Sequence, residues 1–129
     1  YPKNAHTHYT KTKTIAEKAI REAATDELNV IILRPHLIWG PGDPHIVPRV
    51  IQRSKKLIRV GSRNNLVDTI YIDNAADAHI QAAQKLEENP SLSGNIYFIS
   101  QDEPVNLWDW INQFLEKLDL PIIQKIVLF

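Results

Sequence analysis

The 129-residue sequence contains no cysteine and only four glycines. Without cysteine the chain forms no disulfide and performs no thiolate chemistry. Its fifteen basic and fifteen acidic residues cancel, so we expect no basic stripe that would follow a nucleic-acid backbone. The longest apolar runs, residues 30–33 and 126–129, are too short to span a bilayer. A hydrophobic content of 43% still indicates one globular domain with a core.

Five histidines are the remaining candidates for a metal site. His6 and His8 are two residues apart, and His36 and His45 bracket a loop rich in proline and glycine. No third ligand stands at a spacing typical of a zinc site. We therefore expect no metal centre.

Segments with helical and strand-like patterns alternate along the chain, which predicts an α/β fold. We expect a strand buried on both faces at residues 30–33, because this run is continuously apolar and largely β-branched. The loop at residues 40–43, GPGD, is expected to be a turn in which Asp43 bonds the backbone ahead of it. The expected helices cover residues 8–27, 47–56, 73–88 and 107–118, and the other strand-like pieces are residues 57–60, 66–72 and 95–100.

Polar residues before two of the helices are candidate caps. Asn106 is expected to cap the last helix, and Asp73 or Asn74 the helix that runs to residue 88. On the last helix Trp108 shares the apolar stripe, whereas Trp110 lies roughly 200° away around the axis. We expect Trp108 in the core and Trp110 exposed.

Tyr9 and Lys13 stand four residues apart in the first expected helix, so their side chains are neighbours on one face. A positive charge beside a phenol stabilises the phenolate. Such a pair suits general acid/base chemistry on an alcohol or a ketone. Taken alone, the spacing also fits an ordinary pair on a helix surface.

Four segments, in order, resemble the extended short-chain dehydrogenase/reductase superfamily, whose members include the NAD-dependent epimerases and dehydratases. They are YPKNAHTHYTKTKTIAEKAI, LRPHLIWGPGD, NLVDTIYIDNAADAHIQAA and GNIYFISQDEPVNLWDWI. Within it the chain is most similar to the branch of 3β-hydroxysteroid dehydrogenases, sterol-4-carboxylate 3-dehydrogenases and 2-alkyl-3-oxoalkanoate reductases. The resemblance implies the carboxyl-side part of an NAD(P)-binding Rossmann-like fold together with the small substrate-binding region.

The resemblance also implies roles for individual residues. Tyr9 would exchange a proton with the substrate oxygen and lie against the cofactor. Lys13 would hold the nicotinamide ribose hydroxyls of NAD or NADP. The residues that would border the nicotinamide follow the strand and are Pro35, His36, Leu37 and Ile38. The reaction implied interconverts a hydroxyl and a ketone on a hydrophobic, sterol-like or β-keto acid-like small molecule.

The family's glycine-rich phosphate turn has no counterpart in this sequence, since no G-x-x-G-x-x-G occurs. We therefore expect residues 1–129 to be one domain-sized fragment that lacks the amino-terminal dinucleotide-binding half and is inactive alone. Residues 1–39 would end the Rossmann-like part, and residues 40–129 would be mainly the substrate-binding region. Within the latter, residues 73–100 would return to the Rossmann-like part. A cytoplasmic location is expected, with peripheral membrane association and a homodimer left open.

Two alternatives remain open. One is a nucleotide-sugar epimerase or dehydratase; His36 and Leu37 stand where those relatives usually have an asparagine, although Arg63 is available for a diphosphate. The other is a non-catalytic binding module with the dehydrogenase fold, against which the intact Tyr9 and Lys13 argue. The sequence does not distinguish NAD from NADP.

Overall fold

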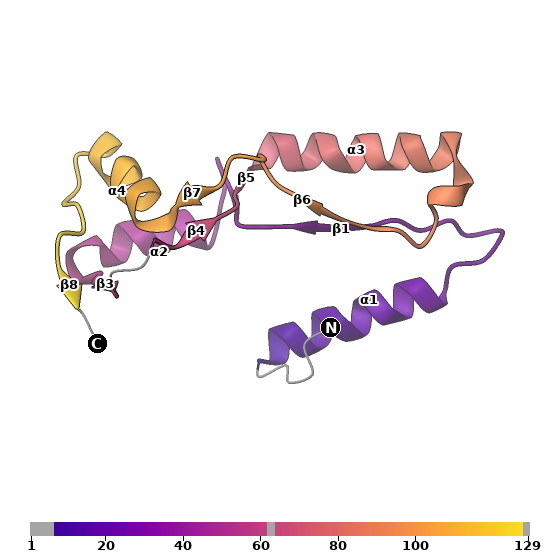
Figure 1. The fold of residues 1–129 in the computed structure, drawn as a ribbon, viewed down its shortest axis with the longest axis horizontal. Helices are drawn as coiled ribbons and strands as arrows, with labels where there is room; N and C mark the ends of the chain where they lie inside the picture. Colours follow the sequence, from indigo (N-terminus) through magenta and orange to yellow (C-terminus); the bar gives the residue numbers. More distant parts are fainter. Residues whose placement is uncertain (1–6, 62–63, 128–129) are drawn as a thin grey trace. The chain divides into compact units, whose positions relative to one another are not determined.

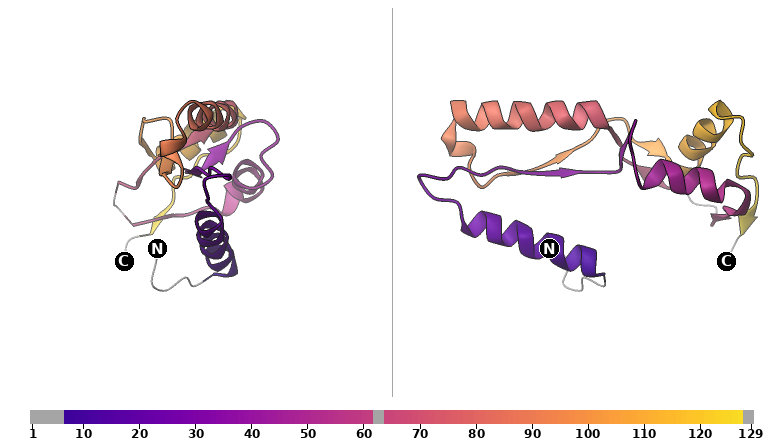
Figure 2. Two further views of the ribbon diagram at one scale, coloured as in Figure 1. Left: turned by 90° about the vertical axis from the view of Figure 1, so that its right-hand side faces the viewer. Right: turned by 180° about the vertical axis from the view of Figure 1, so that it is seen from behind.

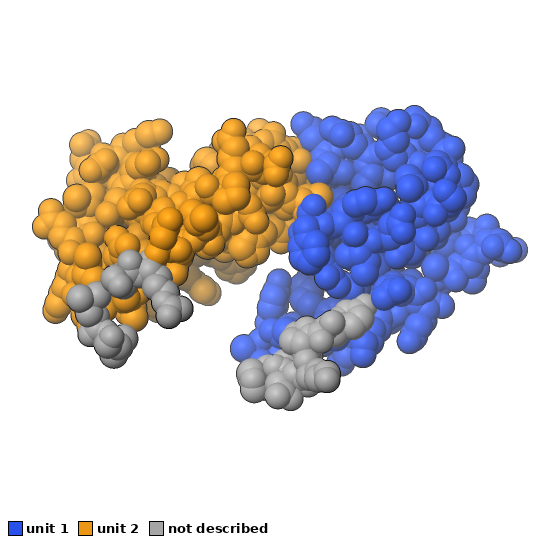
Figure 3. Space-filling view, viewed as in Figure 1, with its two compact units in different colours: residues 1–34, 77–98 blue, residues 35–76, 99–129 orange. Residues whose placement is uncertain are grey.

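A computed structural model describes residues 7–61 and 64–127, and the chain divides into two compact units (Figures 1 and 3). The first unit consists of residues 1–34 and 77–98, and the second of residues 35–76 and 99–129. Helices and strands alternate as expected, so the α/β class is confirmed. None of the helices in the described ranges has the length and apolar character needed to cross a membrane.

The helices match the sequence pattern closely, with one clear difference at a helix end. The first helix stops at Glu22 rather than Glu27, because the Thr25 hydroxyl accepts hydrogen bonds from the N–H groups of Glu27 and Leu28 and forms a turn. The helical segments are α1 (His8–Glu22), α2 (Ile46–Arg53), η1 (Ser54–Lys56), α3 (Ile72–Glu88), η2 (Pro90–Leu92) and α4 (Leu107–Lys117).

The strands are short and form four separate pairs. They are β1 (Ile32–Pro35), β2 (Ile38–Trp39), β3 (Arg59–Val60), β4 (Leu66–Val67), β5 (Ile70–Tyr71), β6 (Ile96–Ile99), β7 (Val105–Asn106) and β8 (Ile126–Val127). β1 pairs with β6, β2 with β5, β3 with β8 and β4 with β7. The pairs β2–β5 and β3–β8 are parallel, and β4–β7 is antiparallel.

The pair β1–β6 lies in the first unit except for its last residues, Pro35 and Ile99, and its two strands run in the same direction (Figures 1 and 2). The N–H of Ile32 donates to the carbonyl of Asn95 at 3.0 Å. The expectation of a strand at residues 30–33 buried on both faces was wrong. The strand begins two residues later, and all four of its residues are only partly buried. A two-stranded pair offers far less cover than the interior of a multi-stranded parallel sheet.

The core of the second unit forms around α4. Ile111, Leu115 and Ile123 are buried, and Leu115 is 0% exposed. The surrounding side chains come from α2, the following segment, α4 and the carboxyl-terminal segment, and are Val50, Leu57, Leu107, Trp108, Trp110, Leu120 and Ile122. The Asn106 side chain caps α4 as expected, since it accepts from the N–H groups of Trp108 and Asp109 at 3.0 and 3.1 Å.

Two other expectations for this unit were wrong. Trp110 is not exposed: it packs on the core and meets the Trp39 ring, 5.7 Å between centroids, in an edge-to-face arrangement. Trp39 comes from a different element, so the helical period of α4 could not indicate this cover. Neither Asp73 nor Asn74 caps α3, because the helix begins at Ile72. The Asn74 amide instead donates to Gln101 Oε1 at 2.7 Å.

Candidate active site

Helix α1 carries the candidate proton-transfer pair in its first two turns. Thr7 caps it, with its Oγ1 accepting from the N–H of Thr10 at 3.1 Å. Lys13 Nζ lies 5.7 Å from the centroid of the Tyr9 ring, within the range of a cation–π contact. The two side chains therefore share one face of the helix, as their spacing predicts.

Both side chains are open to solvent. Tyr9 is 71% exposed, and Lys13 is exposed as well. Within the described ranges no carboxylate forms an ion pair with Lys13. The amine is therefore available to hydrogen-bond acceptors of another molecule, such as ribose hydroxyls.

An ion pair that local sequence patterns do not indicate connects α1 to β1. Arg34 Nε and Nη2 donate to the two carboxylate oxygens of Glu17 at 2.9 and 2.6 Å. The Glu17 side chain is only 14% exposed and that of Arg34 34% exposed, so the pair is partly shielded from water. The Phe98 ring from β6 lies 5.2 Å from the Arg34 guanidinium carbon. This bidentate contact fixes the helix that presents Tyr9.

A signal for this pair was present in the sequence. Glu17 belongs to the alanine-glutamate pair of the first family-like segment, and Arg34 to the LRP that opens the second. Nothing in local periodicity indicates that the two side chains meet, because 17 residues separate them.

In the second unit, residues 35–38 are held against β5 and the residues before it. His36 Nδ1 is 2.8 Å from the carbonyl oxygen of Asp68, to which it donates. The N–H of Ile70 donates to the carbonyl of Leu37 at 3.3 Å, and Ile38 pairs with Ile70 in the ladder. Leu37 has φ +42°, a left-handed conformation uncommon for a non-glycine residue. The loop thus has a defined, slightly strained conformation.

Trp39 and Gly40 close this loop. The Trp39 and Tyr71 rings meet edge to face with 5.1 Å between centroids. A Cβ on Gly40 would lie 2.6 Å from Ile72 Cγ2, and φ there is +143°, so only glycine fits.

The carboxylate of Asp43 anchors the start of α2. It accepts from the N–H groups of His45, Ile46 and Val47 at 2.7, 3.2 and 2.7 Å. Burial raises the pKa of Asp43, but the three backbone donors together outweigh it, with a smaller contribution from the His45 charge, and the pKa is lowered from 3.8. The turn expected at GPGD is confirmed.

The candidate residues belong to different units. Tyr9 and Lys13 lie together in the first unit, and Pro35, His36, Leu37 and Ile38 lie together in the second. Across the described part of the chain, no group of three or more potential ligands could hold a metal ion. His6, one of the histidines considered for such a site, lies outside the described residues.

The whole chain, residues 1–129, matches the model of the 3-beta hydroxysteroid dehydrogenase/isomerase family. The chain belongs to this family. Among curated relatives it is 47% identical to a 2-alkyl-3-oxoalkanoate reductase of Shewanella oneidensis, over 92% of this chain and 33% of that protein. It is 36% identical to the decarboxylating sterol-4-alpha-carboxylate 3-dehydrogenase of Bos taurus, over 87% of this chain and 33% of that protein.

Solved structures of similar fold confirm the architecture of this family member. A dTDP-glucose 4,6-dehydratase of Bacillus anthracis, solved with NAD, matches with a TM-score of 0.65 and 18% identity over 99% of this chain and 41% of that one. RMD of Pseudomonas aeruginosa, solved with NADPH, matches with a TM-score of 0.62 and 17% identity, over 94% of this chain and 43% of that one. The chain thus spans about a third to two fifths of the proteins that it resembles.

Proposed function

We propose that these residues are part of an NAD(P)-dependent oxidoreductase that interconverts a hydroxyl and a ketone on a hydrophobic substrate. The observation that carries this proposal is the exposed pair of Tyr9 and Lys13 on one face of α1. Family membership and the 47% identity to a reductase support the class of reaction.

Tyr9 is the proposed proton donor and acceptor at the substrate oxygen. Tyr9 stands in the first turn of a capped helix, with the Lys13 amine 5.7 Å from the centre of its ring, so its hydroxyl is open to a substrate oxygen beside a cation. The Glu17–Arg34 ion pair fixes the helix and so limits the movement of the phenol.

Lys13 and the loop at residues 35–38 are the proposed contacts to the cofactor, which supplies or accepts the hydride when bound. The Lys13 amine is a triple donor with no carboxylate partner in the described part of the chain, which fits ribose hydroxyls. In open α/β sheets ligands bind beyond the carboxyl ends of strands, and residues 35–38 run from the carboxyl end of β1 into β2. NAD and NADP both fit these contacts.

The proposed substrate is sterol-like or β-keto acid-like. The named relatives are a 2-alkyl-3-oxoalkanoate reductase and sterol-4-alpha-carboxylate 3-dehydrogenases, which favour this class over a nucleotide sugar. The dehydratase matches at 18% identity and supports the fold alone. We also propose that the 129 residues do not turn over by themselves, because no phosphate-binding glycine turn occurs in them.

The proposal is tested with Tyr9→Phe in the full-length protein. This change removes only the hydroxyl, and we expect kcat to fall by about 10²–10⁴-fold with the melting temperature unchanged. Tyr97→Phe, which alters a partly exposed tyrosine on β6, is the matched control and should leave kcat unchanged. Near wild-type turnover by Tyr9→Phe, measured through nicotinamide absorbance, would contradict the assignment.

Lys13→Met tests the cofactor contact separately. We expect the cofactor KM to rise and kcat to fall, because the amine would serve both the ribose and the phenol. Lys11→Met removes an exposed lysine from the same helix and should change neither value. An unchanged cofactor KM in Lys13→Met would contradict the ribose contact.

A further inference from the structure

The whole chain has no net charge, but one segment of it contains an excess of positive charge. Residues 46–60, which form α2, η1 and β3, contain no Asp or Glu. The same 15 residues contain five cations: Arg49, Arg53, Lys55, Lys56 and Arg59. We call residues 46–60 the basic segment.

Helical spacing separates an inner from an outer face of the basic segment. Val50 and Leu57, seven residues apart, pack against the core cluster, and Ser54 between them is 7% exposed. Arg49, Arg53 and Lys56 follow each other at spacings of four and three, so they share one solvent-exposed side, next to the core-facing stripe. The core thus occupies the apolar face and turns the cations outward.

The outward cations are not neutralised within the unit. No ion pair joins them to a carboxylate in the described ranges. Aliphatic side chains that follow the cations along the segment are also open to solvent: Ile58 is 37% exposed and Val60 54%. The segment contains no aromatic residue, so it offers no platform for stacking a base.

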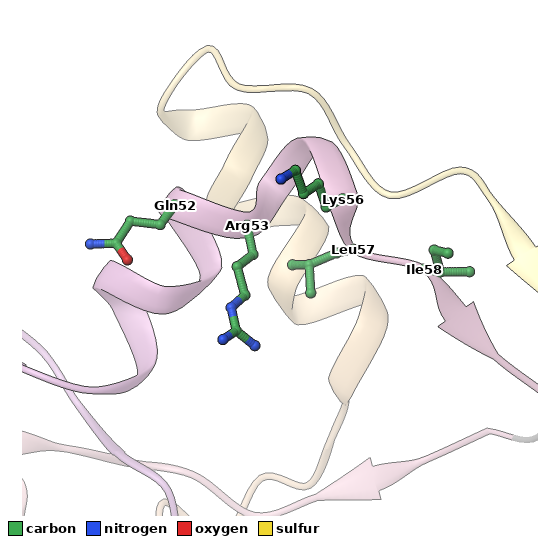
Figure 4. A pocket seen from close by; sticks show the side chains of 5 residues that line it. All are labelled: Gln52, Arg53, Lys56, Leu57 and Ile58. Atoms are coloured by element: carbon green, nitrogen blue, oxygen red, sulfur yellow. The ribbon is translucent and has the colours of Figure 1, made fainter.

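A surface pocket of about 560 Å³ lies on this face (Figure 4). The side chains that line it combine cationic, polar and aliphatic groups and are Gln52, Arg53, Lys56, Leu57 and Ile58. The guanidinium and ammonium groups suit a phosphate oxygen, whereas the aliphatic groups suit the glycerol and first methylenes of a lipid.

We propose that the basic segment is a surface that binds an anionic lipid bilayer. Charge complementarity brings the cations to acidic headgroups, and the exposed aliphatic residues enter the headgroup boundary. Nucleic acid would use the cations but not Ile58 and Val60, and free phosphate would not use these two residues either. Bilayer binding uses both kinds of side chain. The basic segment contains none of the proposed catalytic or cofactor-binding residues.

The test is sedimentation of the full-length protein with vesicles of phosphatidylcholine alone or mixed with phosphatidylglycerol. Binding is expected with the anionic vesicles only, and high salt should weaken it strongly. The variant Arg53→Gln/Lys55→Gln/Lys56→Gln should bind roughly 100-fold more weakly, at about fivefold for each cation removed. The control Lys11→Gln/Lys85→Gln/Lys117→Gln, with the same change in net charge at exposed positions, should bind like the wild type.

Other outcomes would overturn the proposal. They are equal binding to neutral vesicles, equal losses in both triple variants, or retention of binding in the first variant with its fold intact by circular dichroism. A second variant, Ile58→Ser/Val60→Ser, should weaken binding to anionic vesicles while leaving retention on an anionic column unchanged. If this variant binds vesicles like the wild type, or if the protein binds an RNA oligonucleotide but no vesicle, the segment is a general polyanion site and the proposal fails.

Discussion

The two units differ in how much of each is buried. Every buried side chain in the described ranges belongs to the second unit: Ser54, Thr69, Ile70, Ala75, Ile111, Leu115 and Ile123. The first unit contains large apolar side chains as well, but none is buried in the described ranges and several are exposed, with Ile15 at 66%, Ile20 at 50%, Ile80 at 57% and Phe98 at 77%.

Helices α1 and α4 show what this difference means. Both are amphipathic and both are capped by a polar side chain, Thr7 and Asn106 respectively. α4 buries Ile111 and Leu115 in a closed cluster, whereas α1 buries none of its residues and is tied to β1 by the Glu17–Arg34 pair. Amphipathicity therefore indicates which face of a helix is apolar, whereas the neighbouring elements decide whether that face is buried.

The largest expected effect tests the core of the second unit. Leu115→Ala removes a fully buried side chain, and we expect the free energy of unfolding of this chain to fall by about 2–5 kcal/mol in urea. Ile20→Ala, at a half-exposed position of the first unit, should cost under about 1 kcal/mol. If Ile20→Ala costs as much as Leu115→Ala, the contrast between the units is wrong. A large cost only in the full-length protein would show that Ile20 is covered there.

An intermediate effect is expected from the ion pair of the first unit. Glu17→Gln keeps the shape of the side chain but removes its charge, and we expect the full-length protein to lose about 1–2 kcal/mol of stability, because the pair is only partly exposed. Glu22→Gln changes an exposed carboxylate in the last turn of the same helix and should be nearly neutral. Equal effects of the two changes on thermal unfolding would show that the Glu17 contact contributes little.

The smallest expected effect is the loss of stability at low pH, when the Asp43 carboxylate at the start of α2 takes up a proton. The pKa of Asp43 is lowered below 3.8 in the folded state, so its contribution to stability is present at neutral pH and is lost as the pH falls through the folded pKa. Asp43→Asn should therefore lose under about 1 kcal/mol at neutral pH, and the difference from the wild type should shrink below about pH 4. A difference that stays constant down to pH 3 would exclude the charge as its cause.

Local patterns in the sequence were sufficient for much of the fold. They predicted the α/β class, the approximate extents of the four helices, the Asn106 cap and the turn held by Asp43. They also placed Tyr9 and Lys13 on one helical face, because a separation of four residues fixes that relation in any α-helix. The roles of this pair remain predictions.

Relations between distant segments were decided by the tertiary structure alone. The cover of Trp110 by Trp39, the Glu17–Arg34 ion pair and the exposure of α1 each depend on which elements become neighbours. The sequence by itself determined the elements, their caps and the faces that they offer, because these depend on residues within a turn or two of each other. Burial and long-range ion pairs depend on the packing of whole elements, which local spacing does not encode.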